Sequence, residues 1–370
     1  MGKDLLNCQN FNKEFAGRHG MSIKKIAEIT GVSVATVSRV LNNPDYRTAK
    51  KEVRDKILRA AMDINYVPND SARNLKMNKN NKYIYYVDIV VTRMDAGGTD
   101  PFFSELTRYV ESEIHQNNCI LSNIWYHSVF SDEARCEKEN VQALIDEMFC
   151  GDKKPDGFII IGKCSEKVLK LLKNQKVEIV SINRNSTNYE VDEVICDGEK
   201  IASMAVEYLI SLGHRQIAYV GECGNEARYK GYRNTLEKHN IRLDNNFVIE
   251  TMQSVDKGFE VIEDILKKKV IPTAIYCAND IIAVGMLKYL QIGSYYGSRP
   301  SIISSDDIEI AQFTTPMLTT VHLPKRDMAK CAIWMLLDRL NRGHEAVIHM
   351  EMCCKLMVRS SCYAIDFPYN

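Results

Sequence analysis

Apolar residues recur at helical spacing twice within residues 23–43, which predicts two short helices in succession. The first series stops at Thr30-Gly31, a pair typical of a helix terminus. Its apolar positions are Ile23, Ile26, Ala27 and Ile29. The second helix begins after Ser33, a residue type that caps helices. Its apolar positions are Val34, Val37, Val40 and Leu41.

Two short helices joined by a tight glycine-containing turn are typical of the helix-turn-helix, whose second helix enters the major groove of DNA. A helical hairpin packed in a protein core is the alternative interpretation. The outer face of the second helix favours DNA, because it carries small or polar residues suited to a phosphate-lined groove. These residues are Ala35, Thr36, Ser38 and Arg39.

A third helix is predicted from Thr48 to Asn65, with one apolar stripe that closes a small three-helix core. Its stripe consists of Val53, Ile57, Leu58, Ala61 and Ile64. Pro68 ends this region, since proline disfavours a helical residue before it. Residues 69–81 are polar and form a linker.

From Tyr83 onward, short apolar runs alternate with helical patterns. Eight runs predict strands: 84–91, 119–125, 157–162, 178–182, 216–221, 273–279, 301–305 and 318–323. Continuous apolar strands alternating with helices indicate parallel sheets covered on both faces. Eight strands over this length fit two doubly wound sheets better than one. The number of strands by itself would also allow a closed barrel. The fold class is therefore α/β, preceded by an all-α headpiece.

Charge is unevenly placed along a chain of 370 residues whose formal net charge is zero. Residues 1–80 hold 15 Lys or Arg against 8 Asp or Glu, which leaves 33 basic and 40 acidic residues for the remainder. A basic segment attached to an acidic body indicates a nucleic-acid-binding module. The alternative is a basic surface that is only exposed to solvent. It is disfavoured because the basic segment is the one that contains the helix-turn-helix pattern.

The sequence carries no catalytic motif: no Gly-rich phosphate loop, no G-x-S-x-G and only isolated histidines. The twelve cysteines show no metal-ligand spacing, so we expect reduced thiols, no metal and no cofactor. No apolar run approaches the roughly 20 residues that span a bilayer. Residues 1–20 are a polar extension without the apolar core of a signal peptide. We therefore expect a cytoplasmic protein that is not an enzyme and does not contact a membrane.

The segments KKIAEITGVSVATVSRVLNNP and RDKILRAAMDINYVPNDSARNL resemble the headpiece of the lactose-repressor/galactose-repressor family. The resemblance implies a transcription factor with a headpiece at 21–68, a hinge helix at 69–81 and an effector-binding domain at 82–370. That domain would have the two-lobed periplasmic-binding-protein fold. The chain would cross between lobes near 184, 312 and 345. Lobe 1 would then span 82–184 and 313–345, and lobe 2 would span 185–312 and 346–365.

The same resemblance assigns DNA contacts. Val34 and Ala35 occupy the specificity positions, where apolar side chains contact thymine methyl groups. Arg39 is the candidate for a guanine contact, and hydroxyl groups hold phosphates. In the hinge, Leu75 would wedge into the minor groove. The full set of expected DNA-binding residues is Ser33, Val34, Ala35, Thr36, Ser38, Arg39, Asn69, Ala72 and Leu75.

Polar and aromatic residues at the carboxyl ends of the predicted strands match the family's effector cleft, where ligands of open α/β sheets bind. Asp100–Phe103 resembles its N-P-F/Y-F segment, and Arg228 precedes the glycine of G-Y-R by three residues, as the family arginine does. The expected effector-binding residues are Phe102, Phe103, Asn183, Arg228, Asn279 and Asp306. Helix capping alone is the alternative for polar residues at such positions.

Segments such as GFIIIGK and SSDDIEIAQFTTPMLTTVHL look most like galactoside-responsive members of the family, which suggests a galactoside effector. The last two strands are predicted within 348–362 and are expected to return to the second lobe. No leucine heptads follow them, so a dimer is the expected state. The expected partners are double-stranded operator DNA, a sugar effector and a second copy of the chain. A corepressor-dependent regulator with a non-sugar effector and a solute-binding protein are the alternatives.

Overall fold

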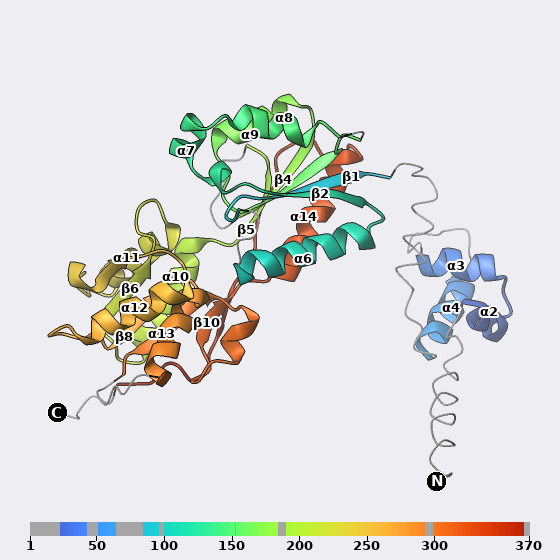
Figure 1. The fold of residues 1–370 in the computed structure, drawn as a ribbon. Helices are drawn as coiled ribbons and strands as arrows, with labels where there is room; N and C mark the ends of the chain where they lie inside the picture. The colour runs from blue at the N-terminus through green and yellow to red at the C-terminus, as the bar shows by residue number, and fades with distance from the viewer. Residues whose placement is uncertain are drawn as a thin grey trace, which may run out of the picture. The chain divides into compact units, whose positions relative to one another are not determined.

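A computed structural model describes residues 23–42, 51–63, 84–95, 100–151, 153–183, 190–292 and 299–365. The chain divides into two compact units between Tyr83 and Ile84. The first unit contains the helices α2 (Ile23–Thr30), α3 (Val34–Asn42) and α4 (Lys51–Asp63) (Figure 1). The described part of α4 lies within the third helix that the sequence predicts.

The three helices of the first unit bury a small apolar core, as the helical spacing of the sequence requires. Its largest fully buried members are Ile26 and Ile57, with Val37 and Val40 also inside. Gly31 joins α2 to α3 at a φ of +70°, a backbone conformation that side chains with a Cβ rarely adopt. Val37 and Val40 therefore support α3 from within the core.

The second unit contains two six-stranded sheets, which confirms the predicted doubly wound architecture. The first sheet contains β1 (Tyr86–Val91), β2 (Ile120–Tyr126), β3 (Gly157–Ile161), β4 (Glu178–Asn183), β5 (Asp192–Ile195) and β11 (His349–Glu351). Its strand order is β11-β5-β4-β3-β1-β2, and all its pairings are parallel.

The second sheet contains β6 (Ile217–Gly221), β7 (Val248–Glu250), β8 (Ala274–Cys277), β9 (Ser301–Asp306), β10 (Thr319–His322) and β12 (Lys355–Met357). Its strand order is β12-β10-β9-β8-β6-β7, with β12 antiparallel to β10 and the other pairings parallel. We call the part of the unit built on the first sheet lobe 1 and the part built on the second sheet lobe 2.

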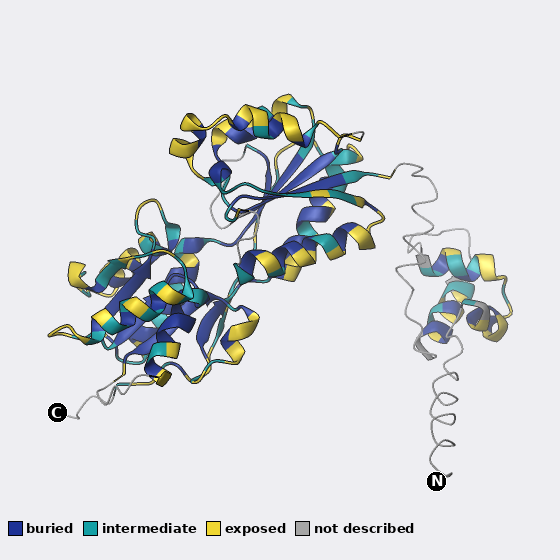
Figure 2. Ribbon diagram, viewed as in Figure 1, coloured by how far each residue is buried: buried dark blue, intermediate teal, exposed yellow. Residues whose placement is uncertain are grey.

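Helices cover both faces of each sheet, and the strands between them are buried (Figure 2). Lobe 1 carries α6 (Pro101–Gln116) and α14 (Lys325–Leu340) on one face, and α7 (Glu133–Lys138), α8 (Val141–Met148) and α9 (Glu166–Asn174) on the other. Lobe 2 carries α10 (Gly198–Ser211) with α11 (Ala227–Lys238), and α12 (Val255–Leu266) with α13 (Asp280–Ile292). Short 3₁₀ segments are η2 (Ser128–Ser131), η3 (Asn245–Phe247) and η4 (Glu309–Gln312).

Successive residues of the central strands point into different cores, which is why these strands are apolar throughout. In β3, Ile159 and Ile161 belong to the core beneath α6 and α14, whereas Phe158 and Ile160 belong to the core beneath α8 and α9. Within the described ranges, no helix is long and apolar enough to cross a membrane.

The crossings between lobes lie further along the chain than the predicted positions 184, 312 and 345. Since β5 pairs with β4, the chain leaves the first sheet only after Ile195. It returns between His322 and Lys325, and it crosses for the last time between Glu351 and Lys355.

The prediction that both final strands return to lobe 2 was wrong, because β11 pairs with β5 in the first sheet. The strands β5 and β11 are both short, and β5 begins with two buried charged residues, Asp192 and Glu193, which leave it only a short apolar run. A strand of three or four residues with charged side chains carries too little periodicity, so β5 was not recognised from the sequence and β11 was assigned to the wrong sheet.

Candidate functional site

The outer face of α3 forms the candidate DNA-reading surface. Ser33 caps the helix, since its Oγ accepts a hydrogen bond from the backbone N–H of Thr36 at 3.1 Å. Val34 is 45% exposed, and Ala35 and Arg39 are exposed as well. Thr36 and Ser38 are half-buried. Six of the nine residues expected to bind DNA are thus exposed or half-buried on the headpiece, while Asn69, Ala72 and Leu75 lie outside the described residues.

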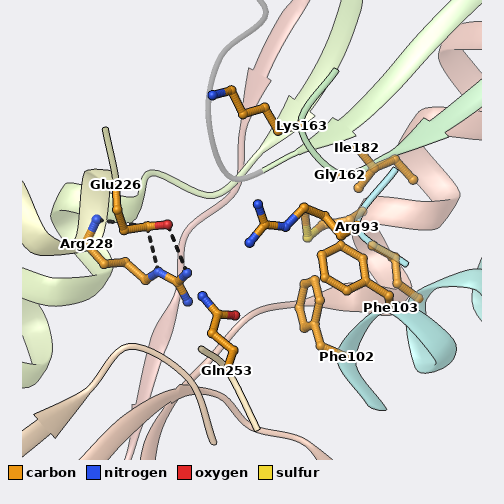
Figure 3. A pocket seen from close by; sticks show the side chains of 11 residues that line it. Arg93, Phe102, Phe103, Gly162, Lys163, Ile182, Glu226, Arg228 and Gln253 are labelled. Atoms are coloured by element: carbon orange, nitrogen blue, oxygen red, sulfur yellow. Dashed lines mark hydrogen bonds and ion pairs between the residues drawn. The ribbon is translucent and has the colours of Figure 1, made fainter. Parts of the chain in front are cut away.

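A cleft lies between the carboxyl ends of the strands of the two lobes (Figure 3). Lobe 1 lines it with Arg93, Phe102, Phe103, Lys163 and Ile182, and lobe 2 with Glu226, Arg228 and Gln253. The free space left between these side chains is about 40 Å³. That is room for a few water molecules and less than a sugar ring needs, so a ligand of that size requires side chains or lobes to move.

The aromatic residues of lobe 1 are held at the start of α6. Asp100 caps this helix by accepting hydrogen bonds from the backbone N–H groups of Phe102 and Phe103, at 2.9 and 3.4 Å. Pro101 follows at the first helical position, where its missing N–H costs nothing. The two rings pack edge to face with centroids 5.2 Å apart. The cap and the ring contact together fix an apolar wall for the cleft.

Arg228 of lobe 2 uses three of its five N–H groups in hydrogen bonds within the protein. Its Nε donates to Glu226 Oε1 at 2.8 Å, its Nη2 donates to Glu226 Oε2 at 3.2 Å, and its Nη1 donates to the Ala278 carbonyl. The Arg228 side chain is 3% exposed and that of Glu226 is 11% exposed. Burial alone would lower the pKa of Arg228, but the carboxylates of Glu226 and Asp306 outweigh it and hold that pKa well above its usual value. Arg228 therefore remains charged and bonded to Glu226.

Arg93 of lobe 1 is held much more loosely. Its Nη2 donates to Oε1 of Glu222 in lobe 2 at 3.0 Å, and the two side chains are 28% and 45% exposed. Gly162 makes room for it: a Cβ at this position would lie 2.9 Å from Arg93 Cγ, on a backbone whose φ is +105°. Ion pairs at such exposure contribute about 0–1 kcal/mol. The Arg93–Glu222 pair thus crosses the cleft without locking it.

The other polar residues predicted for lobe 2 lie behind the cleft surface. Asn279 caps α13 through its Oδ1, which accepts from the Ile282 N–H at 3.2 Å, and its Nδ2 donates to Gln253 Oε1 at 2.9 Å. Asp306 is 3% exposed at a φ of +124° and lies close enough to Arg228 to influence its pKa. Neither lines the cleft directly. Gln253, which does line it, is held by Asn279.

Asp280 connects three segments of lobe 2 while fully buried. Its carboxylate accepts hydrogen bonds from Ser304 Oγ at 2.5 Å, Thr320 Oγ1 at 2.6 Å and the Ile308 N–H at 2.8 Å. Burial and the nearby charge of Asp306 raise the pKa of Asp280 to about 7, although the hydrogen bonds act in the opposite direction. The capping role considered for Asp280 from sequence is therefore part of a wider structural one.

Lys325, at the start of α14, links the two lobes. Its Nζ donates to the carbonyls of Asp306 and Asp307 and pairs with Glu105 Oε2 of α6, each at 2.9 Å. The ammonium also lies 5.6 Å from the centroid of the Phe102 ring. This buried cation connects the end of β9 to the helix that carries the aromatic pair.

Sequence reasoning found three of the residues that line the cleft, Phe102, Phe103 and Arg228. Asn183 ends β4, but its side chain lies outside what the structure describes. Arg93 and Lys163 were missed, although both follow strand ends and the same rule would have found them. Gln253 was missed because the short strand before it, β7, gave no periodic signal. Among the described residues, no group of three or more His, Cys, Asp or Glu side chains is arranged to hold a metal ion.

The chain is similar to known proteins over nearly its whole length. Residues 22–69 match bacterial regulatory proteins of the lacI family, and residues 206–362 match a periplasmic binding protein-like domain. The HTH-type transcriptional regulator MalR of Clostridium butyricum is 30% identical over 357 residues, which cover 93% of this chain and 100% of that relative.

A second relative, the HTH-type transcriptional repressor PurR of Vibrio vulnificus, is 28% identical over 353 residues, which cover 93% of this chain and 99% of the repressor. Among solved structures, a complex of the transcriptional regulator CelR with cellobiose matches with a TM-score of 0.64 and 20% identity. That match covers 93% of this chain and 100% of the CelR chain, and it concerns the fold.

Proposed function

Because the chain belongs to the lacI family of bacterial regulatory proteins, we propose that it represses sugar-utilisation genes as a dimer under the control of a sugar effector. Membership of this family establishes that the chain is a DNA-binding transcriptional regulator. The dimer, the pseudo-palindromic operator and the choice of a galactoside as effector are the proposed parts. A galactoside is the first candidate because of the sequence likeness to galactoside-responsive members.

The cleft supports a sugar effector through one observation above all: an aromatic pair and several hydrogen-bonding groups converge on the same space. Phe102 and Phe103 offer apolar surface on one side, and the Arg228–Glu226 pair and Gln253 offer polar atoms on the other (Figure 3). Sugar rings present both an apolar face and hydroxyl groups, and ligand sites combine apolar walls with a few placed polar groups. CelR, which shares the fold, is known in complex with cellobiose.

A groove on the surface of the second unit supports the dimer. It is lined by Ser104 and Arg108 of α6 and by Val284 of α13, with Ile310 and Phe313 near η4. Ile310 is 46% exposed and Phe313 is 76% exposed, which is costly for side chains of this size unless another surface covers them. A second copy of the chain seated on this groove would bury them.

This groove shares a helix with the cleft, because α6 lines the cleft with Phe102 and Phe103 and the groove with Ser104 and Arg108. Since α6 belongs to lobe 1 and α13 to lobe 2, a dimer formed here would sense the relative position of the two lobes. An effector that favours one lobe arrangement would then change the spacing of the two headpieces. Such couplings are typically about 1–3 kcal/mol, and the effector supplies only its difference in affinity for the two states.

A gel-shift titration of the full-length protein on its own upstream DNA tests this function, with and without galactose, lactose and allolactose. We expect specific binding that a galactoside weakens. Binding that a galactoside strengthens would identify corepression rather than induction. Binding that none of the three alters would remove the galactoside from the proposal, and the absence of specific binding at moderate salt would favour a solute-binding protein.

The hinge prediction has a test of its own. Leu75→Ala should weaken specific operator binding by tenfold or more, because the side chain that wedges into the minor groove is removed. Sugar binding should stay unchanged, since Leu75 lies in the segment before the second unit. Operator affinity equal to that of the wild type would exclude the hinge from the mechanism.

A further inference from the structure

The C-terminal end of α14 and the chain that follows it enclose a buried carboxylate. Asp192, the first residue of β5, is fully buried. It accepts hydrogen bonds from Arg339 Nη2 at 2.6 Å, from Arg339 Nε at 2.7 Å and from the Ile348 N–H at 2.7 Å. Burial alone would raise the pKa of Asp192, but its hydrogen bonds, led by those from Arg339, outweigh burial and hold that pKa below its usual value. Asp192 is therefore ionised at neutral pH.

His344 lies between this carboxylate and a second one. Its Nε2 is 2.8 Å from Asp192 Oδ2, and its Nδ1 is 2.6 Å from Oδ2 of Asp338 in α14. The His344 side chain is 14% exposed. A neutral imidazole has one N–H group, whereas the imidazolium has two. Only the charged ring can donate to both carboxylates, because in the neutral ring the lone pair of one nitrogen faces a carboxylate oxygen.

The charges around His344 agree with this geometry. Asp338 and Asp192 raise the pKa of His344 above its ordinary value, although burial and Arg339 act in the opposite direction. Glu178 of β4 reaches the cluster through Arg339 Nε, at 3.8 Å. Because the folded-state pKa of His344 exceeds the unfolded value of about 6.5, its contribution to stability is fully present below about pH 6.5. That contribution is lost as pH rises through the folded-state pKa.

The segment that His344 fastens leads to the last crossing between the lobes. Arg339 donates to two backbone carbonyls of this segment, at 3.1 and 3.3 Å. β11 follows on the outer edge of the first sheet, where its three residues pair with β5. Its last residue, Glu351, accepts a hydrogen bond from Lys200 Nζ in α10 of lobe 2 at 2.6 Å. Since a three-residue edge strand pairs with one neighbour only, its position depends on the contacts that precede it.

We propose that His344 is a pH-sensitive latch: when protonated it fastens residues 341–352 to lobe 1, and its deprotonation loosens this segment and the last crossing between the lobes. The proposal does not depend on the identity of the effector. His349 in β11 reinforces the latch, because its Nδ1 lies 2.6 Å from Oε1 of the buried Glu193. The latch couples the freedom of the lobes to move to the pH around the protein.

Hydrogen exchange of the full-length protein from pH 6 to pH 8.5 tests the latch, with peptide mass spectrometry and correction for the intrinsic pH dependence of amide exchange. In the wild type, we expect the protection of β11 to fall roughly fivefold or more across this range. His344→Gln cannot carry the charge and should show low protection throughout. Asp338→Asn should keep its protection throughout. A neutral ring then donates to Asp192, and the asparagine amide donates to the other ring nitrogen.

The matched control is His239→Gln, since His239 pairs with Glu207 at 3.8 Å in lobe 2 and lies outside the latch. Its exchange should equal that of the wild type at every pH. Constant protection of β11 in the wild type would refute the latch, and equal pH dependence in His344→Gln would assign the change to another group. If Asp338→Asn lost as much protection as His344→Gln, the cluster would be an ordinary structural ion pair.

Direct titration decides the case even if His344→Gln does not fold. Exchange of the imidazole C2 hydrogen, followed by mass spectrometry, measures the pKa of each histidine in the full-length protein. We expect the pKa of His344 to lie above about 6.5 in the wild type and to be lower in Asp338→Asn. A wild-type pKa at or below that value would overturn the proposal, because the ring would be mostly neutral near pH 7 and could not hold both carboxylates.

Discussion

The two walls of the cleft occupy equivalent positions at the carboxyl ends of parallel strands, but their polar side chains are satisfied to different degrees. In lobe 2, Arg228, Asn279 and Asp280 are buried and bonded to neighbours in the same lobe. In lobe 1, Arg93 is half-buried and reaches across to the other lobe. The position of a polar residue at a strand end thus does not reveal whether it serves a ligand or the fold. The hydrogen bonds that the residue makes within its own lobe distinguish the two roles better.

The largest effect should come from breaking the Arg228–Glu226 pair. Arg228→Met should cost about 3–5 kcal/mol in the free energy of unfolding, because the Glu226 carboxylate, only 11% exposed, would lose its partner. Urea denaturation of the full-length protein measures this loss. The double variant Arg228→Met/Glu226→Gln should recover part of it, since no charge then remains unpaired. A loss below about 1 kcal/mol in the single variant would show that the pair is not structural.

The second test concerns Asp280, whose pKa is raised to about 7 in the folded protein. A carboxylic acid with a folded-state pKa above its unfolded value binds its proton more tightly when folded. Its contribution to stability therefore falls as pH rises from about 4 to about 7 and is constant above that range. Asp280→Asn cannot titrate, so the stability difference between wild type and variant should change over this interval. A difference that stays constant from pH 4 to pH 8 would contradict the raised pKa.

These two cases show what sequence could and could not provide. The apolar runs predicted eight of the strands and the strand-end rule led to Arg228, because both depend on local pattern. Glu226 was overlooked although it lies two residues before Arg228, since nothing local indicates that its side chain turns back to the arginine. The raised pKa of Asp280 depends on Ser304, Thr320 and Asp306, which only the fold brings together.

The lobe boundaries illustrate the same limit. β5, β7 and β11 are three or four residues long, so each is defined by the neighbour it pairs with rather than by its own pattern. Overlooking β5 and assigning β11 to lobe 2 moved the first and last predicted crossings toward the N-terminus, and overlooking β7 hid Gln253. Long apolar strands can be recognised from their own sequence, whereas these short strands depend on tertiary pairing.

A smaller effect is expected from the aromatic wall of lobe 1. Phe102→Leu keeps an apolar side chain of similar volume, so the free energy of unfolding should fall by less than about 1.5 kcal/mol. Effector affinity should fall about two- to tenfold if the proposed sugar stacks on this ring, because the aromatic surface that faces Phe103 is lost. Titration with whichever sugar releases the protein from its operator measures this change. Unchanged affinity would place the sugar away from the aromatic pair.

The smallest effect on stability should come from Arg93→Gln, and its contrast with Arg228→Met tests the comparison directly. The Arg93–Glu222 pair is half-exposed, and such pairs contribute about 0–1 kcal/mol. Glutamine can still donate to Glu222, and water can solvate what it leaves unbonded. Urea denaturation should therefore place this variant within about 1 kcal/mol of the wild type. A loss as large as that of Arg228→Met would mean that both walls are structural, and that the cleft owes its recognition of ligands to backbone and aromatic groups rather than to either arginine.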